Sequence, residues 1–255
     1  MIVAANDNNI NEIKEFCKDS LFGARVLCLC ECYGFGYDFL KAYLLYDDSD
    51  TVSGIFTSFY GNITIVSCDK TDFDEINVFL KLIGYSSVTA EPVFFEKINA
   101  ENIEIRQAYR FDAGCDFEPS EEAAESDYKS VYKLISQATP GSFNDSAQAY
   151  LSWLSDFTFR KRRLFARMKC IKKDNEVISC AMTAAECEYG AIISGVACAA
   201  DKRKSGAGKS VVLTLANELK NENKDVYVIA LNRSAEGFYE HIGFEKCCRV
   251  AIMER

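Results

Sequence analysis

Residues 190–224 place an apolar run, a basic glycine-rich loop and an amphipathic segment one after another. The run GAIISGVACAA has the composition of a buried strand, and after the loop DKRKSGAGKS the residues Val211, Val212, Leu215 and Leu219 recur at helical spacing. A strand that enters a helix through glycines presents unpaired backbone N–H groups and the positive end of the helix dipole. We therefore expect an anion-binding site in this loop.

Two nucleotide-binding motifs fit the loop incompletely. A P-loop, G-x-x-x-x-G-K-[ST], would end at Gly208, Lys209 and Ser210, but Arg203 stands where its first glycine belongs. The following strand, DVYVIALN, also ends in asparagine rather than in an aspartate that could hold magnesium. The dinucleotide fingerprint G-x-G-x-x-G has Val211 at its third glycine. ATP binding stays open as an alternative.

The composition of the chain further limits the classes of function that we expect. The net charge of -9 argues against nucleic-acid binding. No uncharged apolar run approaches the ~18 residues of a membrane span. Because a basic segment followed by an apolar core is missing at the start, we expect no signal peptide and a cytoplasmic protein.

Twelve cysteines are expected to act as small buried hydrophobes in a reducing compartment. Cys28, Cys30 and Cys32 alternate in VLCLCECYG, which in a strand would place all three on one face. Their spacing is not the C-x-x-C of zinc or redox sites, and His241 is the only histidine. We predict no metal site.

An acidic segment beginning at Asp112, DAGCDFEPSEEAAESDYK, divides the chain, and we place a domain boundary near residue 118. In domain 119–255 the patterns predict two helices, three strands, the loop, a helix, a strand, a helix and a strand, with Ser126 and Ser234 as helix caps. Domain 1–118 repeats three strands, a loop, a helix and a strand. Its loop, VSCDKTDFDE, contains no glycine, so we predict a divergent internal repeat.

The spacing of Arg203, Gly206 and Gly208, R-x-x-G-x-G, resembles the pyrophosphate loop of the GNAT superfamily of acetyl-CoA-dependent N-acetyltransferases. Farther along, LNRSAEGFYEHIGFEKC resembles that family's second signature, an asparagine followed by A-x-x-F-Y-x-x-x-G-F. The resemblance covers about residues 119–255. It implies an α/β (α+β) fold with a mixed, mostly antiparallel sheet flanked by helices, in two tandem copies of which the first is degenerate.

The resemblance also implies where acetyl-CoA would bind. The backbone of one strand would pair with the pantetheine arm and polarise the thioester carbonyl, and the loop amides would hold the pyrophosphate. Arg203 is a phosphate contact or a structural brace, Asn232 a pantetheine contact or a cap, and Phe238 a core residue that could touch CoA. The implied residues are Val196, Ala197, Cys198, Arg203, Lys204, Ser205, Gly206, Ala207, Gly208, Lys209, Ser210, Asn232 and Phe238.

In the family an amine attacks acetyl-CoA directly, without a covalent enzyme intermediate. Tyr239 matches the position of the acid that protonates the thiolate leaving group, since a phenol with a pKa near ~10 stays protonated at neutral pH. Its alternative role is core packing. Glu186 and Glu188 could accept the amine proton through water or could be hairpin charges, so no base is assigned.

We expect a small-molecule or peptide amine as acceptor and a monomer or homodimer without nucleic-acid or membrane partners. A CoA-binding module without catalysis is the alternative function, because a fold alone does not establish an activity.

Overall fold

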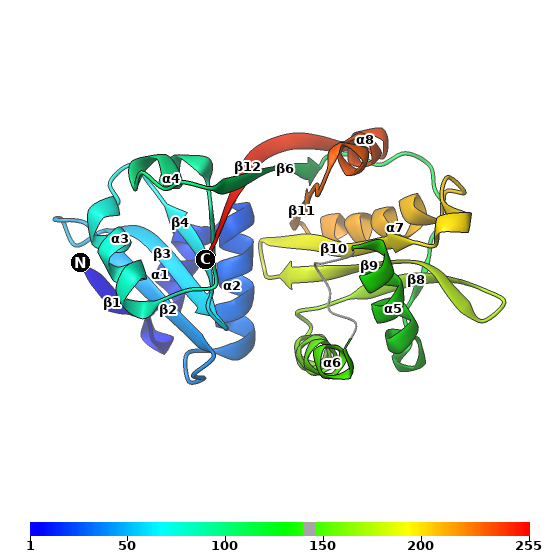
Figure 1. Cartoon of the computed structure of the whole chain (residues 1–255), viewed down its shortest axis with the longest axis horizontal. Coiled ribbons are helices and arrows are strands. Elements are labelled where there is room, and N and C mark those ends of the chain that lie inside the picture. The colour runs from blue at the N-terminus through cyan, green and yellow to red at the C-terminus, as the bar shows by residue number, and fades with distance from the viewer. Residues whose placement is uncertain (140–145) are drawn as a thin grey trace. The chain divides into compact units, whose positions relative to one another are not determined.

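The computed structural model describes residues 1–139 and 146–255, which form two compact units (Figure 1). The first unit comprises Met1–Tyr109, Ile229–Glu236 and Lys246–Arg255. The second comprises Arg110–Val228 and Gly237–Glu245.

The first unit is an open sheet with strand order β1-β2-β3-β4-β5-β12-β6. Strands β1 to β4 pair antiparallel, β4 and β5 pair parallel, and the chain's last strand, β12, pairs antiparallel with β5. Its elements are β1 (Ile2–Ala4), α1 (Ile10–Cys17), α2 (Leu21–Tyr33), β2 (Leu40–Tyr46), β3 (Val52–Phe59), β4 (Asn62–Ser67), α3 (Phe73–Ile83), β5 (Ser87–Ala90), α4 (Pro92–Lys97), β6 (Ile103–Phe111) and β12 (Phe244–Glu254).

The second unit has the strand order β11-β10-β9-β8-β7. Neighbours pair antiparallel, apart from the parallel pair β10–β11. Its elements are β7 (Glu121–Glu122), α5 (Tyr128–Ala138), α6 (Ala147–Arg162), β8 (Met168–Lys173), β9 (Glu176–Glu186), β10 (Gly190–Cys198), α7 (Ala207–Asn221), β11 (Asp225–Ile229) and α8 (Arg233–His241), the first turn of α8 being grouped with the first unit.

Each unit has its own hydrophobic core. In the first unit, Phe56, Phe94 and Phe95 are fully buried and pack with the inner faces of α3, β4 and β5. In the second, Phe157 of α6 and Met168 of β8 pack with α5 on one face of the sheet, while α7 packs on β8, β9 and β10. Burying such side chains contributes roughly 1.5–3 kcal/mol each, which fixes the sheet that carries the site.

The predicted internal repeat of fold is confirmed. Both units run through three antiparallel strands, a loop, a helix and a strand that pairs parallel with the third. The correspondence extends to single hydrogen bonds. Ser86 N–H donates to Gly61 O at 2.8 Å where β5 begins, and Asp225 N–H donates to Tyr189 O at 2.9 Å where β11 begins.

Cys28, Cys30 and Cys32 lie in the helix α2, so their alternation does not place them on one face of a strand. Ser20 caps that helix by accepting a hydrogen bond from Gly23 N–H at 3.2 Å. Nearly every side chain of α2 is buried, so the sequence shows neither the 3.6-residue period of a half-exposed helix nor a polar face.

The helix after the acidic segment also begins differently from the prediction. Ser126 lies inside a 3₁₀ turn, and α5 starts after Asp127. The Asp127 carboxylate accepts a hydrogen bond from Ala124 N–H at 3.0 Å, so it fixes the turn before the helix rather than the first helical turn.

Candidate functional site

The site begins where β10 continues beyond its pairing with β11. Their parallel pairing ends at Ile193 opposite Val228, but β10 continues to Cys198. The register with β9 shifts between Ser194 and Ala197, and Gly195 in this bulge has φ +58°. A β-carbon at this glycine would lie 2.9 Å from the Met182 side chain and 3.0 Å from that of Ile135, so the bulge requires glycine.

The bulge determines which backbone groups of β10 face the open edge. Ala199 N–H donates to Ile178 O at 2.9 Å, and the Ser179 hydroxyl donates to Ala197 O at 3.0 Å, so Ala197 and Ala199 face β9. Backbone groups alternate between the two edges of a strand. The N–H and C=O groups of Val196 and Cys198 therefore point to the edge that β11 has left.

The loop after β10 ends in a helix that no side chain caps. Gly206 is the N-cap residue of α7, with φ +91° and no side-chain cap hydrogen bond. The first helical hydrogen bond runs from Ser210 N–H to Gly206 O at 3.0 Å, so the N–H groups of Ala207, Gly208 and Lys209 lack an acceptor within the helix. This helix end offers donors and positive potential to an anion.

The cations of the loop divide into two groups. Arg203 and Lys204 are exposed, and among the described residues no acid forms an ion pair with either, which disfavours Arg203 as a brace. Lys202 pairs with Asp201 at 2.6 Å. The Ser205 hydroxyl donates to Lys202 O at 2.7 Å and closes the turn.

The side chains of Lys209 and Ser210 instead donate hydrogen bonds to the backbone of residues 116 and 118. The Lys209 ammonium donates to Asp116 O at 2.6 Å, and the buried Ser210 hydroxyl donates to Glu118 O. Ser120 N–H donates to the Thr214 hydroxyl at 2.9 Å. These bonds tie residues 116–120 along the first turns of α7. Because the Lys209 ammonium is bound to the Asp116 carbonyl, it does not take the position of a P-loop lysine. The Ser210 N–H already donates to Gly206 O, so Ser210 has no backbone donor for a ligand.

The second motif supplies a buried tyrosine. Tyr239 on α8 is 7% exposed, and its ring packs at a tilted angle against those of Phe238 and Phe244, with ring centroids 5.3 and 5.7 Å away. Burial raises the pKa of its phenol to about 12. Phe238 lies against α7, since a β-carbon on Gly208 would be 3.7 Å from its ring. Phe238 of α8 therefore packs against the start of α7.

Asn232 caps α8. Its side-chain oxygen accepts a hydrogen bond from Ala235 N–H at 3.0 Å, and α8 starts at Arg233. The predicted cap Ser234 lies within the first turn. This bond uses one of the two acceptor positions of the Asn232 side-chain oxygen.

Glu186 belongs to a buried ion cluster. It is 1% exposed, and its carboxylate contacts Arg167 at 2.7 Å and Lys224 at 2.8 Å. Arg167 also pairs with Glu222 at 2.6 Å and, by hydrogen bonding, lowers the pKa of that carboxyl to about 2. Two cations therefore pair with the Glu186 carboxylate. Its carboxylate joins β9 to the end of α7 and is not available as a base.

Sequence reasoning missed two contributors, Ser179 and the carbonyls of residues 116 and 118. A serine inside an apolar strand carries no distinguishing pattern, and the carbonyls act as backbone, so neither leaves a signal in the residue types.

Comparisons with known proteins agree with this geometry. The family model described as the acetyltransferase (GNAT) family matches residues 128–244, which contain the β10 edge, the loop, α7 and Tyr239. Residues 128–244 are therefore a domain of the GNAT family. A search of curated proteins found no match.

Solved GNAT structures share the fold of the whole chain. A tandem GNAT protein from the clavulanic acid biosynthesis pathway aligns over 100% of this chain and 98% of its own, with a TM-score of 0.65 and 11% identity. A GNAT-family acetyltransferase from Colwellia psychrerythraea aligns over 100% and 99%, with a TM-score of 0.59 and 12% identity. A Drosophila protein aligns over 100% and 98%, with a TM-score of 0.65 and 12% identity. At sequence identities of 11–12%, the similarity shows only that these proteins share the fold of the chain, including its duplication.

Two features are absent from residues 1–139 and 146–255. None of the helices there combines the length and apolarity needed to cross a membrane. Three or more histidine, cysteine or acidic side chains do not gather there as a metal site.

Proposed function

We propose that the second unit transfers an acetyl group from acetyl-CoA to a primary amine by direct attack of the amine on the thioester. The observation that carries this proposal is the continuation of β10 beyond its pairing with β11, which ends at Ile193. This leaves an open strand edge that is followed by the uncapped N-terminus of α7. An extended pantetheine arm needs such an edge, and a pyrophosphate needs such a helix end.

The pyrophosphate would lie on the backbone of residues 203–209. The N–H groups of Ala207, Gly208 and Lys209 lack helical acceptors, and Gly206 and Ser205 complete the turn before them. Arg203 and Lys204 add exposed positive charge, and hydrogen bonds from ionised donors to phosphate are about twice as strong as neutral ones.

The pantetheine arm would pair with β10 as an added strand. The outward-facing N–H and C=O groups of Val196 and Cys198 match its two amides, while Ala197, held by Ser179, keeps the strand in register. Backbone donors near the bulge would then stabilise the negative charge that develops on the thioester oxygen.

Tyr239 would donate a hydrogen bond to the sulfur of the leaving thiolate. Its raised pKa keeps the phenol protonated, which suits a donor and excludes a base at neutral pH. Because an alkyl thiol has a pKa near ~8.5, hydrogen-bond donation is favoured over full proton transfer from the phenol.

Ligand binding tests the proposal first. CoA and acetyl-CoA at millimolar concentration should raise the melting temperature, because binding to the native state stabilises it by RT ln(1 + [L]/Kd). A panel of amines, from polyamines to peptides, should then release free thiol from acetyl-CoA. Stabilisation by ATP-magnesium instead of CoA would support the P-loop alternative. Binding of CoA without turnover of any amine would support the non-catalytic module.

A further inference from the structure

The last strand carries two adjacent cysteines whose sulfur atoms lie close together. Neighbouring side chains of a strand point to opposite faces, yet the Sγ atoms of Cys247 and Cys248 are 3.8 Å apart. Cys247 is exposed and Cys248 is half-buried, so solutes can reach the pair. The pair lies on the part of β12 that belongs to the first unit, outside the proposed acetyl-CoA site.

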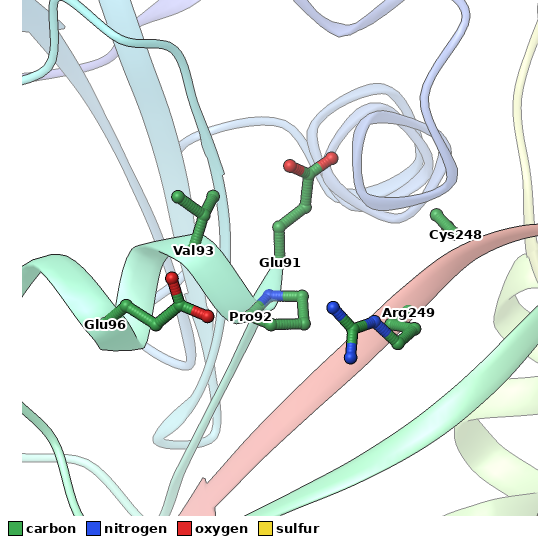
Figure 2. A pocket seen from close by; sticks show the side chains of 6 residues that line it. All are labelled: Glu91, Pro92, Val93, Glu96, Cys248 and Arg249. Carbon is green, nitrogen blue, oxygen red and sulfur yellow. The ribbon is translucent and has the colours of Figure 1, made fainter.

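Cys248 also lines a pocket of the first unit with a volume of about 320 Å³. Figure 2 shows Cys248 and Arg249 on β12 and Glu96 on α4 around this pocket. The other lining residues are Glu91, Pro92 and Val93. Two carboxylates against one guanidinium leave an excess of negative charge, which attracts cations.

Two thiol sulfurs at this separation can bind one soft centre together, because soft metals and metalloids prefer sulfur ligands. A soft metal or metalloid displaces the thiol proton as it binds and holds the sulfur as thiolate.

We propose that Cys247 and Cys248 form a two-sulfur site for a soft, thiophilic metal or metalloid. Within the described parts of the chain, these sulfurs belong to no group of three or more potential metal ligands. The site therefore suits a centre that needs two protein sulfurs, such as trivalent arsenic that already carries one organic substituent. Each centre bound forms two bonds to sulfur and displaces two thiol protons.

Phenylarsine oxide tests this site on the whole protein. Its arsenic forms two As–S bonds, and its oxygen leaves with the two thiol protons as water. Intact mass under native conditions should show one phenylarsenic group per chain. A thiol titration should show two thiols fewer than in the untreated protein. Consumption of one thiol, or no adduct, overturns the proposal.

Serine variants locate the adduct. Cys247→Ser and Cys248→Ser should each abolish stable capture, while Cys68→Ser and Cys115→Ser, which alter exposed single cysteines, should retain it. An adduct that survives Cys247→Ser contradicts the assignment. Because Cys247 is exposed, its variant decides the question even if Cys248→Ser unfolds, and circular dichroism verifies the fold.

Discussion

The two units differ most where the third strand leads into a helix. In the first unit Asp72 caps α3 by accepting a hydrogen bond from Glu75 N–H at 2.9 Å, and Asp74 and Glu75 add negative charge to the first turn. In the second unit Gly206 stands at the cap position without a side chain. In the first unit, carboxylates at the N-terminus of α3 accept from an N–H group and offset the helix dipole, so this end does not favour an anion. In the second unit, the N-terminus of α7 has no such carboxylate, and its N–H groups can bind an anion.

The short helix after the parallel strand shows a second difference. The sequences FFEKIN in the first unit and FYEHIG in the second align, and so do their hydrogen bonds: Ile98 N–H donates to Phe94 O, and Ile242 N–H donates to Phe238 O, both at 3.2 Å. Phe95 then stands where the second unit has Tyr239. The first copy keeps the buried ring and lacks the hydroxyl that catalysis would need.

Gly206→Asp imports the cap of the first unit and should have the largest effect. The carboxylate would take up the helix N–H groups and oppose the phosphates, which costs about 4 kcal/mol from lost charge-assisted bonds and dipole attraction. Isothermal titration should show CoA binding weakened on the order of 1000-fold. Gly206→Asn is the control, because asparagine tolerates the φ of +91° at this position and carries no charge. This variant should lose much less affinity for CoA. Equal losses in the two variants would mean that charge does not govern CoA binding.

Tyr239→Phe makes the second unit resemble the first. We expect kcat to fall about 100-fold, the lower range for a general acid, with the Kd for CoA unchanged. Tyr227→Phe, which removes the hydroxyl of another buried tyrosine in the same unit, serves as the control. Unchanged kcat in the Tyr239 variant would return this residue to a packing role.

The loop cations should have a smaller effect. Arg203→Ala should weaken CoA binding about 3- to 10-fold, as exposed charge-assisted contacts contribute about 1 kcal/mol, and added salt should reduce the difference. Lys70→Ala removes an exposed cation from the matching loop of the first unit and should leave the affinity unchanged. A loss in the Lys70 variant would show that the first copy takes part in CoA binding.

The smallest expected effect is on the stability of the protein at acid pH. The hydrogen bond with Arg167 lowers the pKa of the Glu222 carboxyl to about 2 in the native protein, against an ordinary value of 4.5. The pair therefore stabilises the second unit above about pH 4.5, and this stabilisation is lost as the pH falls toward 2. Melting temperatures of wild type and Glu222→Gln should approach each other as the pH falls from 5 toward 2.

Much of the fold could be predicted from local pattern. The strand-loop-helix units of both halves follow from alternation, helical spacing and glycine placement. The helix α2 could not, because a helix buried on nearly all sides leaves no period in its sequence. Nor could the cap of α8, because Asn232 and Ser234 are both good N-cap residues and only the backbone geometry selects between them.

The sequence by itself determined that one loop, and not its counterpart, can hold an anion, because the charges and glycines that decide this are neighbours in the chain. It also determined that only one copy carries a tyrosine in the second motif. The tertiary structure decided which loop groups are available. Lys209 and Ser210 are bound to residues 116 and 118, more than ninety positions away in sequence, and Glu186 is paired with Arg167 and Lys224, which lie in two other segments of the chain. Local spacing cannot anticipate such partners, since distant segments meet only when the core is packed.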